Sequence, residues 1–388
     1  MKMKKFLAAF LALTMVVLCF AACGKGDNGG TAGEKTLKIG LSGPLTGDAA
    51  QYGNGVKNGA QLAVDEINAA GGVNGIKLDF KMEDDEADSE KAKNAYGALK
   101  DWGMQISLGT VTSGACIAFQ GEASKDNMFV LTPSATAVEA INGANAFRVC
   151  FADPQQGVES ADYIAKNALA TKVAVIYDSS DAYSSGIYDA FVAEAKAKGL
   201  DVVTTQSFTE DTGTDFSAQV QAVKSSGAEL LFLPIYYKEA TLILQTAKKA
   251  ALDIKYFGCD GLDGILTMEN FDASLAENVM LLTPFAKNAT DEFTVNFVTK
   301  YKEAYGESTM NQFAADAYDA IYILKAAIEK ANITADMTSS QICDALKAVM
   351  TEINYTGVTA KGMTWGADGE PSKPPIVVKV ENGAYTIL

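Results

Sequence analysis

The feature that most constrains the fold is a repeated alternation of short apolar runs with longer amphipathic segments. The runs have the length of strands, and the segments between them carry apolar residues at helical spacing. Such β-α repeats predict mainly parallel sheets with helices on both faces, and two series divided near residue 153 predict two lobes of this α/β type. The expected strands are 36–41, 77–83, 106–108, 129–131, 172–177, 200–205, 229–234 and 256–258, and the expected helices are 56–70, 89–102, 115–124, 154–167, 184–198, 215–225 and 238–251.

Beyond residue 258 the pattern changes. Long amphipathic helices are expected over 291–305, 311–330 and 339–350, and β-like segments around 355–365 and 376–388. In parallel sheets, ligands bind beyond the carboxyl ends of the strands. The loops that follow the predicted strands are therefore where binding residues are expected.

Composition excludes several kinds of function. The 388 residues include no histidine, and 48 acidic residues against 32 basic ones give a net charge of −16. Histidine-based catalysis and histidine-ligated zinc are therefore excluded, and the acidic balance disfavours a nucleic-acid partner such as the operator of a DNA-binding regulator. Arg148 is the single arginine. We find neither a paired-acid motif nor a nucleophile beside a base, so no enzyme, catalytic residue, metal or cofactor is expected.

The first 35 residues read as a leader and a tether. Three lysines among the first five residues precede an apolar run over 6–18, and Ala21 and Ala22 stand directly before Cys23. This order resembles the bacterial lipobox and predicts a signal peptide over 1–22, a lipid on Cys23 and a flexible tether over 23–35. The alternative is a plain signal peptide in which Cys23 is incidental. Either way an extracytoplasmic protein is expected, anchored to the cell membrane in the first case.

The four later cysteines do not form a metal or redox motif. Cys116, Cys150, Cys259 and Cys343 include no C-x-x-C pair, which leaves a structural zinc or a thioredoxin-type site without support. Export permits disulfides, but the spacing does not identify partners. Small buried thiols are the expected state.

The loops after the predicted strands have a common chemistry. Residues 109–114 and 132–136 are small, rich in hydroxyls and placed near helix starts, where free N–H groups favour an anion. Taken alone, each loop is better explained as a helix cap that holds no ligand, but two of them on neighbouring strands predict an anion cradle. In the second series the loops around Tyr183, Tyr236 and Asp260 supply phenols and a carboxylate.

Several motifs in fixed order resemble one known family. They include 37–47 with Tyr52, the turn 71–75, the acidic strand end 83–85, the loop 132–136 and the pair at 260–261. Over residues 36–388 the chain resembles the type I periplasmic binding proteins of the branched-chain amino acid (Leu/Ile/Val) ABC import family.

The resemblance implies a two-lobed clamp that binds an amino acid and delivers it to a permease with an ATPase subunit. It implies a monomer with lobe 1 formed by 36–153 plus 285–366 and lobe 2 by 154–284 plus 370–388, joined by chain crossings near 153–154, 283–284 and 365–373. A sensory protein of the same fold, or a binder of amides or urea, remains an alternative.

The resemblance also assigns roles to individual residues. The ligand carboxylate is expected to bind Ser113, Ser134 and Thr136, and the ligand ammonium to bind Asp260 and Thr136. The tyrosines that close over the ligand are expected to be Tyr52, Tyr183 and Tyr236. The pocket for the ligand side chain is expected to be lined by Val111 and Thr112. The chain departs from the family pattern at Asp260, where leucine-type members usually carry Glu, and at Ala182, an extra residue before Tyr183. Ala87 and Thr112 stand where those members have a disulfide. The identity of the ligand side chain is therefore left open.

Overall fold

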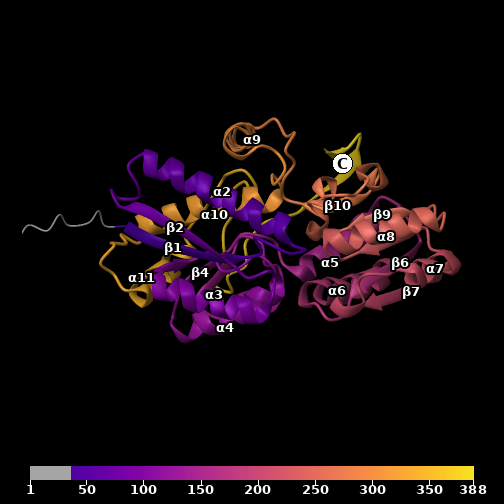
Figure 1. Ribbon diagram of the computed structural model, residues 1–388, viewed down its shortest axis with the longest axis horizontal. Helices are drawn as coiled ribbons and strands as arrows, with labels where there is room; N and C mark the ends of the chain where they lie inside the picture. The colour runs from indigo at the N-terminus through magenta and orange to yellow at the C-terminus, as the bar shows by residue number, and fades with distance from the viewer. Residues whose placement is uncertain (1–35) are drawn as a thin grey trace, which may run out of the picture. The chain divides into compact units, whose positions relative to one another are not determined.

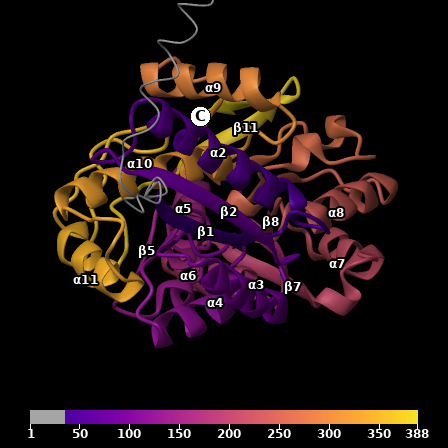
Figure 2. The same ribbon diagram turned by 60° about the vertical axis from the view of Figure 1, so that its left-hand side comes forward.

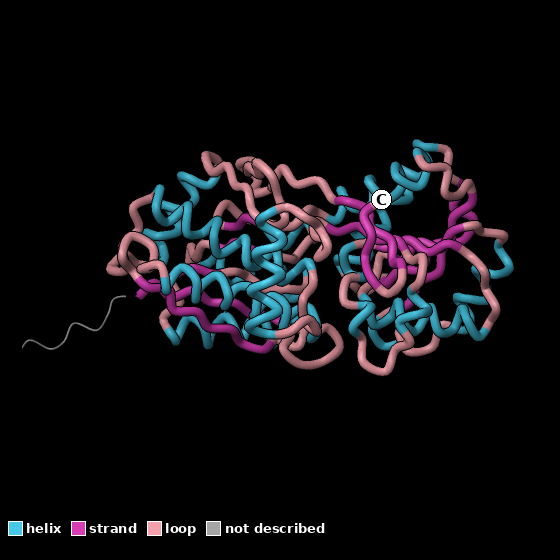
Figure 3. The backbone as a smooth tube through the Cα atoms, turned by 90° about the horizontal axis from the view of Figure 1, so that it is seen from above, coloured by secondary structure: helices cyan, strands magenta, loops and turns pink. Residues whose placement is uncertain are grey.

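Two sheets organise the part of the chain that the structure describes. The computed structural model describes residues 36–388, so the predicted signal peptide, Cys23 and the tether lie outside the described residues. The first sheet has the order β2-β1-β3-β4-β5, and its strands are parallel (Figure 1). The second has the order β12-β11-β10-β9-β8-β6-β7 and is parallel except at β11 and β12. Figure 3 shows the strands in magenta with the helices in cyan around them. The predicted α/β class is confirmed.

The elements have the following bounds. The first sheet contains β1 (Thr36–Gly43), β2 (Lys77–Asp84), β3 (Ile106–Ser107), β4 (Val130–Thr132) and β5 (Ala146–Arg148). The second contains β6 (Lys172–Asp178), β7 (Asp201–Phe208), β8 (Leu230–Leu233), β9 (Lys255–Gly258), β10 (Met280–Thr283), β11 (Ile376–Glu381) and β12 (Ala384–Ile387). The α-helices are α2 (Ala50–Ala69), α3 (Ser89–Trp102), α4 (Ser113–Lys125), α5 (Asp153–Lys166), α6 (Ala182–Lys198), α7 (Ser217–Ser226), α8 (Tyr237–Lys249), α9 (Glu292–Tyr305), α10 (Gln312–Lys330) and α11 (Ser339–Met350).

Both faces of each sheet are covered because alternate strand residues point to opposite sides. In β1, Leu37, Ile39 and Leu41 are fully buried in the cluster that includes α2 and α10. Gly40 faces the other side, where a Cβ would come within 2.3 Å of the Met104 sulfur. Figure 2 shows α3 and α4 on one side of β1, with α2 and α10 on the other. In the second sheet, α5 and α6 pack on one face and α7 and α8 on the other.

The predicted elements differ from the structure in a few places. Helix α2 begins at Ala50, six residues before the predicted start, because Gly53 and Gly55 hide the helical periodicity. The segment 355–365, predicted to be β-like, contributes only the isolated bridges Tyr355–Met363 and Trp365–Pro371. Strands β5 and β10 were not among the predicted strands.

The chain passes between the two sheets three times. Strand β5 belongs to the first sheet and is followed by β6 of the second, while α10 packs on α2 before β11 returns to the second sheet. These passages fall after Arg148, after Thr283 and before Ile376. The lobe boundaries given above stay a prediction. Within residues 36–388, none of the helices has both the length and the apolar character that a membrane span requires.

Candidate functional site

One cavity lies where loops from the carboxyl ends of both sheets meet. Its free space in this structure is small, about that of one water molecule. All nine residues predicted to contact a ligand line it, together with two that were not predicted, Gly261 and Phe313. The predicted residues are Tyr52, Val111, Thr112, Ser113, Ser134, Thr136, Tyr183, Tyr236 and Asp260. The structure therefore brings the whole predicted set together, while the role of each residue toward a ligand stays a prediction.

Hydroxyl groups on the side of the first sheet are fixed by bonds between two loops. Ser113 begins α4, and its Oγ accepts hydrogen bonds from the backbone N–H groups of Thr136 at 3.3 Å and Ala137 at 3.1 Å. The Ser134 hydroxyl donates to the Val111 carbonyl at 2.6 Å. Because a hydroxyl has one proton and two acceptor sites, Ser113 keeps its proton available for a partner in the cavity.

The buried hydroxyl of Thr112 adds a second available group. Thr112 is the N-cap of α4, but its side chain makes no capping bond, and its Oγ1 has no hydrogen-bond partner among the described residues. Most buried polar atoms are paired, so an unpaired hydroxyl at a helix start indicates a place that a ligand can satisfy.

Asp260 is the acid on the opposite side of the cavity. It follows β9, is 3% exposed, and its Oδ1 accepts a hydrogen bond from the Tyr183 hydroxyl at 2.8 Å. Its backbone is also held, because its N–H donates to Gln156 Oε1 at 3.0 Å and its carbonyl accepts from Gln312 Nε2 at 2.7 Å. Burial raises the pKa of the Asp260 carboxyl to about 7, and the Tyr183 hydrogen bond offsets part of that shift. A cationic ligand group beside it would restore the charged form.

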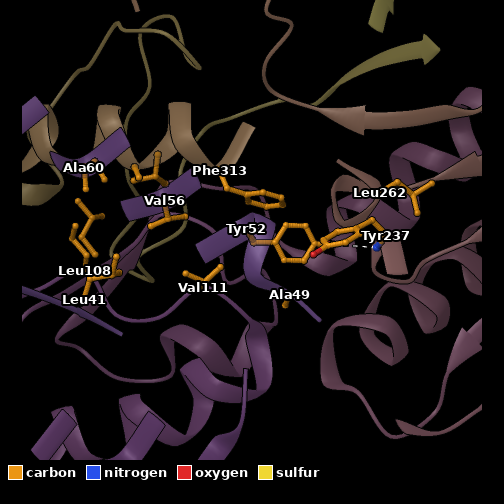
Figure 4. Packing of buried hydrophobic residues seen from close by; sticks show 14 of the residues in the cluster. Leu41, Ala49, Tyr52, Val56, Ala60, Leu108, Val111, Tyr237, Leu262 and Phe313 are labelled. Carbon is orange, nitrogen blue, oxygen red and sulfur yellow. Dashed lines mark hydrogen bonds between the residues drawn. The ribbon is translucent and has the colours of Figure 1, made fainter. Parts of the chain in front are cut away.

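Aromatic rings enclose the rest of the cavity. Tyr183 and Tyr236 are stacked with their centroids 4.7 Å apart, and Tyr52 meets Phe313 edge-on at 4.8 Å. Figure 4 shows Tyr52 between Phe313 and Tyr237. The Tyr183 hydroxyl also accepts from the Gly261 N–H at 2.9 Å, which fixes the ring beside Asp260.

Contacts between residues of the two sheets close the cavity at Tyr52. Its hydroxyl donates to the Gly261 carbonyl and accepts from the Tyr237 N–H. The Tyr237 hydroxyl in turn donates to the Asp48 carbonyl at 2.6 Å, and Lys238 forms an ion pair with the Asp48 carboxylate. Tyr52 and Asp48 precede or begin α2, whereas Tyr237 and Lys238 begin α8, so these bonds bridge the two sheets.

Two residues that line the cavity, Gly261 and Phe313, were not predicted from the sequence. Gly261 adjoins Asp260 and could have been included from the loop that contains both. Phe313 gave no signal, because it lies in the first turn of α10, far along the chain from the strand-end loops. The four described cysteines are all free and buried, which confirms the expectation of buried thiols. Among residues 36–388, no group of His, Cys, Asp or Glu side chains is arranged to hold a metal ion.

Comparisons with known proteins agree with this architecture. A family model described as periplasmic binding protein matches residues 36–384. The chain is 33% identical over 349 residues to the Leu/Ile/Val-binding protein homolog 3 of Brucella melitensis, a match that covers 87% of this chain and 89% of the relative.

Solved structures show the same likeness. The branched-chain amino acid transporter substrate binding protein LivJ of Streptococcus pneumoniae, in complex with isoleucine, is 28% identical with a TM-score of 0.81, covering 91% of this chain and 99% of that one. A solute binding protein from R. palustris in complex with benzoate is 20% identical with a TM-score of 0.80, covering 91% and 95%, and this likeness concerns the fold alone.

Proposed function

The chain belongs to the periplasmic binding protein family, as its sequence motifs predicted, and on that premise we propose that it binds an amino acid for import by an ABC transporter. Family membership implies an extracytoplasmic location. One relative is named as a Leu/Ile/Val-binding protein homolog, and the similar LivJ structure contains isoleucine, which supports an apolar or branched-chain amino acid as the ligand.

One observation carries the proposal, namely the opposed chemistry of the two sides of the cavity. Hydroxyls and loop N–H groups around Ser113, Ser134 and Thr136 suit a carboxylate, and Asp260 on the other side suits an ammonium group. A micromolar affinity requires about −8 kcal/mol. Three or four charge-assisted hydrogen bonds of about 1.5–3 kcal/mol each, with burial of the side chain, are sufficient for that affinity.

Ligand capture is proposed to proceed by closure of the two predicted lobes, 36–153 plus 285–366 and 154–284 plus 370–388. The amino acid places its carboxylate on the first lobe, and the second lobe then brings Asp260 and Tyr183 to its ammonium. The bonds from Tyr52 to Gly261 and from Tyr237 to Asp48 support closure, because they join residues of the two predicted lobes that would separate when the lobes open.

Thermal shift against the twenty amino acids, a few amides and benzoate tests the proposal, since a ligand that binds only the native state raises the melting temperature. Calorimetry with the best ligand then compares Asp260→Ala with wild type and with Asp162→Ala, which removes a half-buried acid of α5 that is paired with Lys198. We expect Asp260→Ala to weaken binding by at least about 1.5 kcal/mol and Asp162→Ala to leave it unchanged. An unchanged affinity for Asp260→Ala would refute the ammonium role.

An aromatic carboxylate is the second candidate ligand. The rings of Tyr52, Tyr183, Tyr236 and Phe313 offer stacking surfaces, and the hydroxyl groups serve a carboxylate whether or not an ammonium is present. In that case benzoate would raise the melting temperature in the thermal-shift assay. It would bind Asp260→Ala at least as tightly as it binds the wild-type protein. An amide or urea ligand would likewise be insensitive to loss of the acid.

Attachment and delivery are proposed separately. We propose that Cys23 carries a lipid and that the tether 23–35 leads from it to the described residues. Metabolic labelling with a palmitate analogue should tag wild type and spare Cys23→Ser, whereas equal labelling would exclude the anchor. Deletion of the gene should abolish high-affinity uptake of the ligand if the protein serves a permease, and should leave uptake intact if it is a sensor.

A further inference from the structure

A buried acid beside the cavity has no cation paired with it among the described residues. Asp153 is the first residue of α5 and is 1% exposed, and its carboxyl group makes no ion pair within residues 36–388. The Thr136 side chain, which lines the cavity, lies close enough to its carboxyl group to lower its pKa against the larger opposing effect of burial. The backbone N–H of Asp153 donates to the Thr136 carbonyl at 2.9 Å, so Asp153 is bonded directly to a residue that lines the cavity. An unpaired buried carboxyl group is costly, and such a group in a native protein calls for an explanation.

The first turn of α5 connects Asp153 to the other acid of the site. Gln156 lies in the same turn, and its Oε1 accepts from the Asp260 N–H, while its Nε2 has no partner in the described part of the chain. On the opposite side Gly186 packs so closely that a Cβ there would come within 3.4 Å of Asp153 Oδ2. Asp153 is thus held in place between α6 and the cavity-lining residues.

The charges around Asp153 are mostly negative. The carboxylates of Asp260 and Asp181 lie near enough to raise its pKa, beyond the larger effect of burial, and the nearby cation is Arg148. The guanidinium of Arg148 is already engaged, since it donates to the carbonyls of Ala135 and Ala137 and lies 3.2 Å from Glu370. The region therefore has an excess of acid beside Thr136 that the described residues do not neutralise.

We propose that Asp153 is a second acid of the ammonium subsite, acting with Asp260 to select ligands that carry a cationic nitrogen beside their carboxylate. The inference rests on the proposed binding of an amino acid in this cavity. An ammonium held near Thr136 places a positive charge next to both acids, which removes the repulsion between them. A ligand with a carboxylate alone leaves that repulsion in place, so Asp153 discriminates against it.

Calorimetry on the full chain tests this with two probes, the amino acid that gives the largest thermal shift and its des-amino carboxylic acid. We expect Asp153→Asn to weaken binding of the amino acid by about tenfold. Its affinity for the des-amino acid should be unchanged or higher, because only the cation interacts with the lost charge. Asp162→Asn makes the same charge change farther along α5, on a side chain paired with Lys198. It should leave both affinities within about twofold of wild type.

The proposal is overturned if Asp153→Asn weakens the binding of both probes equally, as a structural role predicts. It is also overturned if the affinity of this variant for the amino acid stays within twofold of wild type. If that variant does not fold, Asp153→Ala replaces it, and wild type supplies an independent arm: equal affinity for the amino acid and the des-amino acid also overturns the proposal. Failure of the proposed function is a different result, in which wild type binds no amino acid in either assay.

Discussion

Ligand affinity should fall as the pH is lowered through neutrality, because protons compete with the ligand ammonium for Asp260. Burial raises the pKa of this carboxyl to about 7, although the hydrogen bond from the Tyr183 hydroxyl opposes the shift. Only the charged carboxylate attracts an ammonium, so the free protein must lose a proton before or during binding below this pH. The free amino acid remains a zwitterion over the same range and adds no dependence of its own.

The size of the effect follows from the pKa. If the bound state keeps Asp260 charged, the apparent Kd is multiplied by about 11 at pH 6 and by about 1.1 at pH 8, a loss of about 1.4 kcal/mol between the two. At pH 7 about half a proton should be released for each ligand bound. Burial also raises the pKa of Asp181, to about 6, and the pKa of Asp153, so part of the change with pH belongs to these two acids.

Calorimetry at pH 6, 7 and 8 and constant ionic strength measures the affinity, and two buffers of different ionisation enthalpy measure proton release. Asp260→Asn is the control, since its amide does not titrate. It should bind more weakly than wild type at pH 8 and show a smaller dependence on pH. A wild-type affinity that is flat from pH 8 to 6, or an equal slope in Asp260→Asn, would refute the reasoning.

Three further predictions concern stability and closure. A raised carboxyl pKa lowers stability as pH rises from the unfolded value toward 7, so Asp260→Asn should raise the melting temperature of the ligand-free protein more at pH 8 than at pH 5, by calorimetric scans. Tyr183→Phe removes a hydrogen bond to Asp260 and leaves the buried Gly261 N–H unpaired, so ligand titration should show a loss of about 1–3 kcal/mol. Asp48→Asn removes an exposed ion pair with Lys238, so the ligand-binding free energy should weaken by less than about 1 kcal/mol. Stopped-flow measurements should show faster ligand dissociation in this variant, and high salt should produce the same increase in wild type.

Most of the fold was predictable because its elements carry strong local patterns. The long helices and the longer strands have clear periodicity, and the rule that ligands bind at carboxyl strand ends brought six separate loops to one place. The start of α2 was lost because glycines replace the apolar residues that would mark it. Gly55 shows why a glycine stands there, since a Cβ would come within 2.9 Å of the Thr309 carbonyl oxygen, just before α10. Close packing of two helices selected residues that carry no helical signal of their own.

The site was predictable as a set of residues but not as a network. The sequence placed Asp260 and Tyr183 in loops of the same edge, but the hydrogen bond that joins them depends on the register of β6 and β9 within the second sheet. Asp153 was expected only at a chain crossing. Its position beside the cavity depends on how α5 meets α6 and the loop at Thr136, which is a property of tertiary packing and not of the local sequence.

The single arginine, Arg148, supports the loop that faces the cavity and does not itself line the cavity. Arg148 is fully buried and donates to the carbonyls of Ala135 and Ala137, so its guanidinium supports the loop that carries Ser134 and Thr136 from behind. A guanidinium that faced the cavity would compete with any ligand ammonium for the acids opposite. Because that cation is bound to the scaffold, neutral donors are left for the carboxylate, and no arginine pairs with the acids that face the ammonium. The scarcity of basic groups that disfavours polyanionic partners is therefore the same property that suits the cavity to a zwitterion.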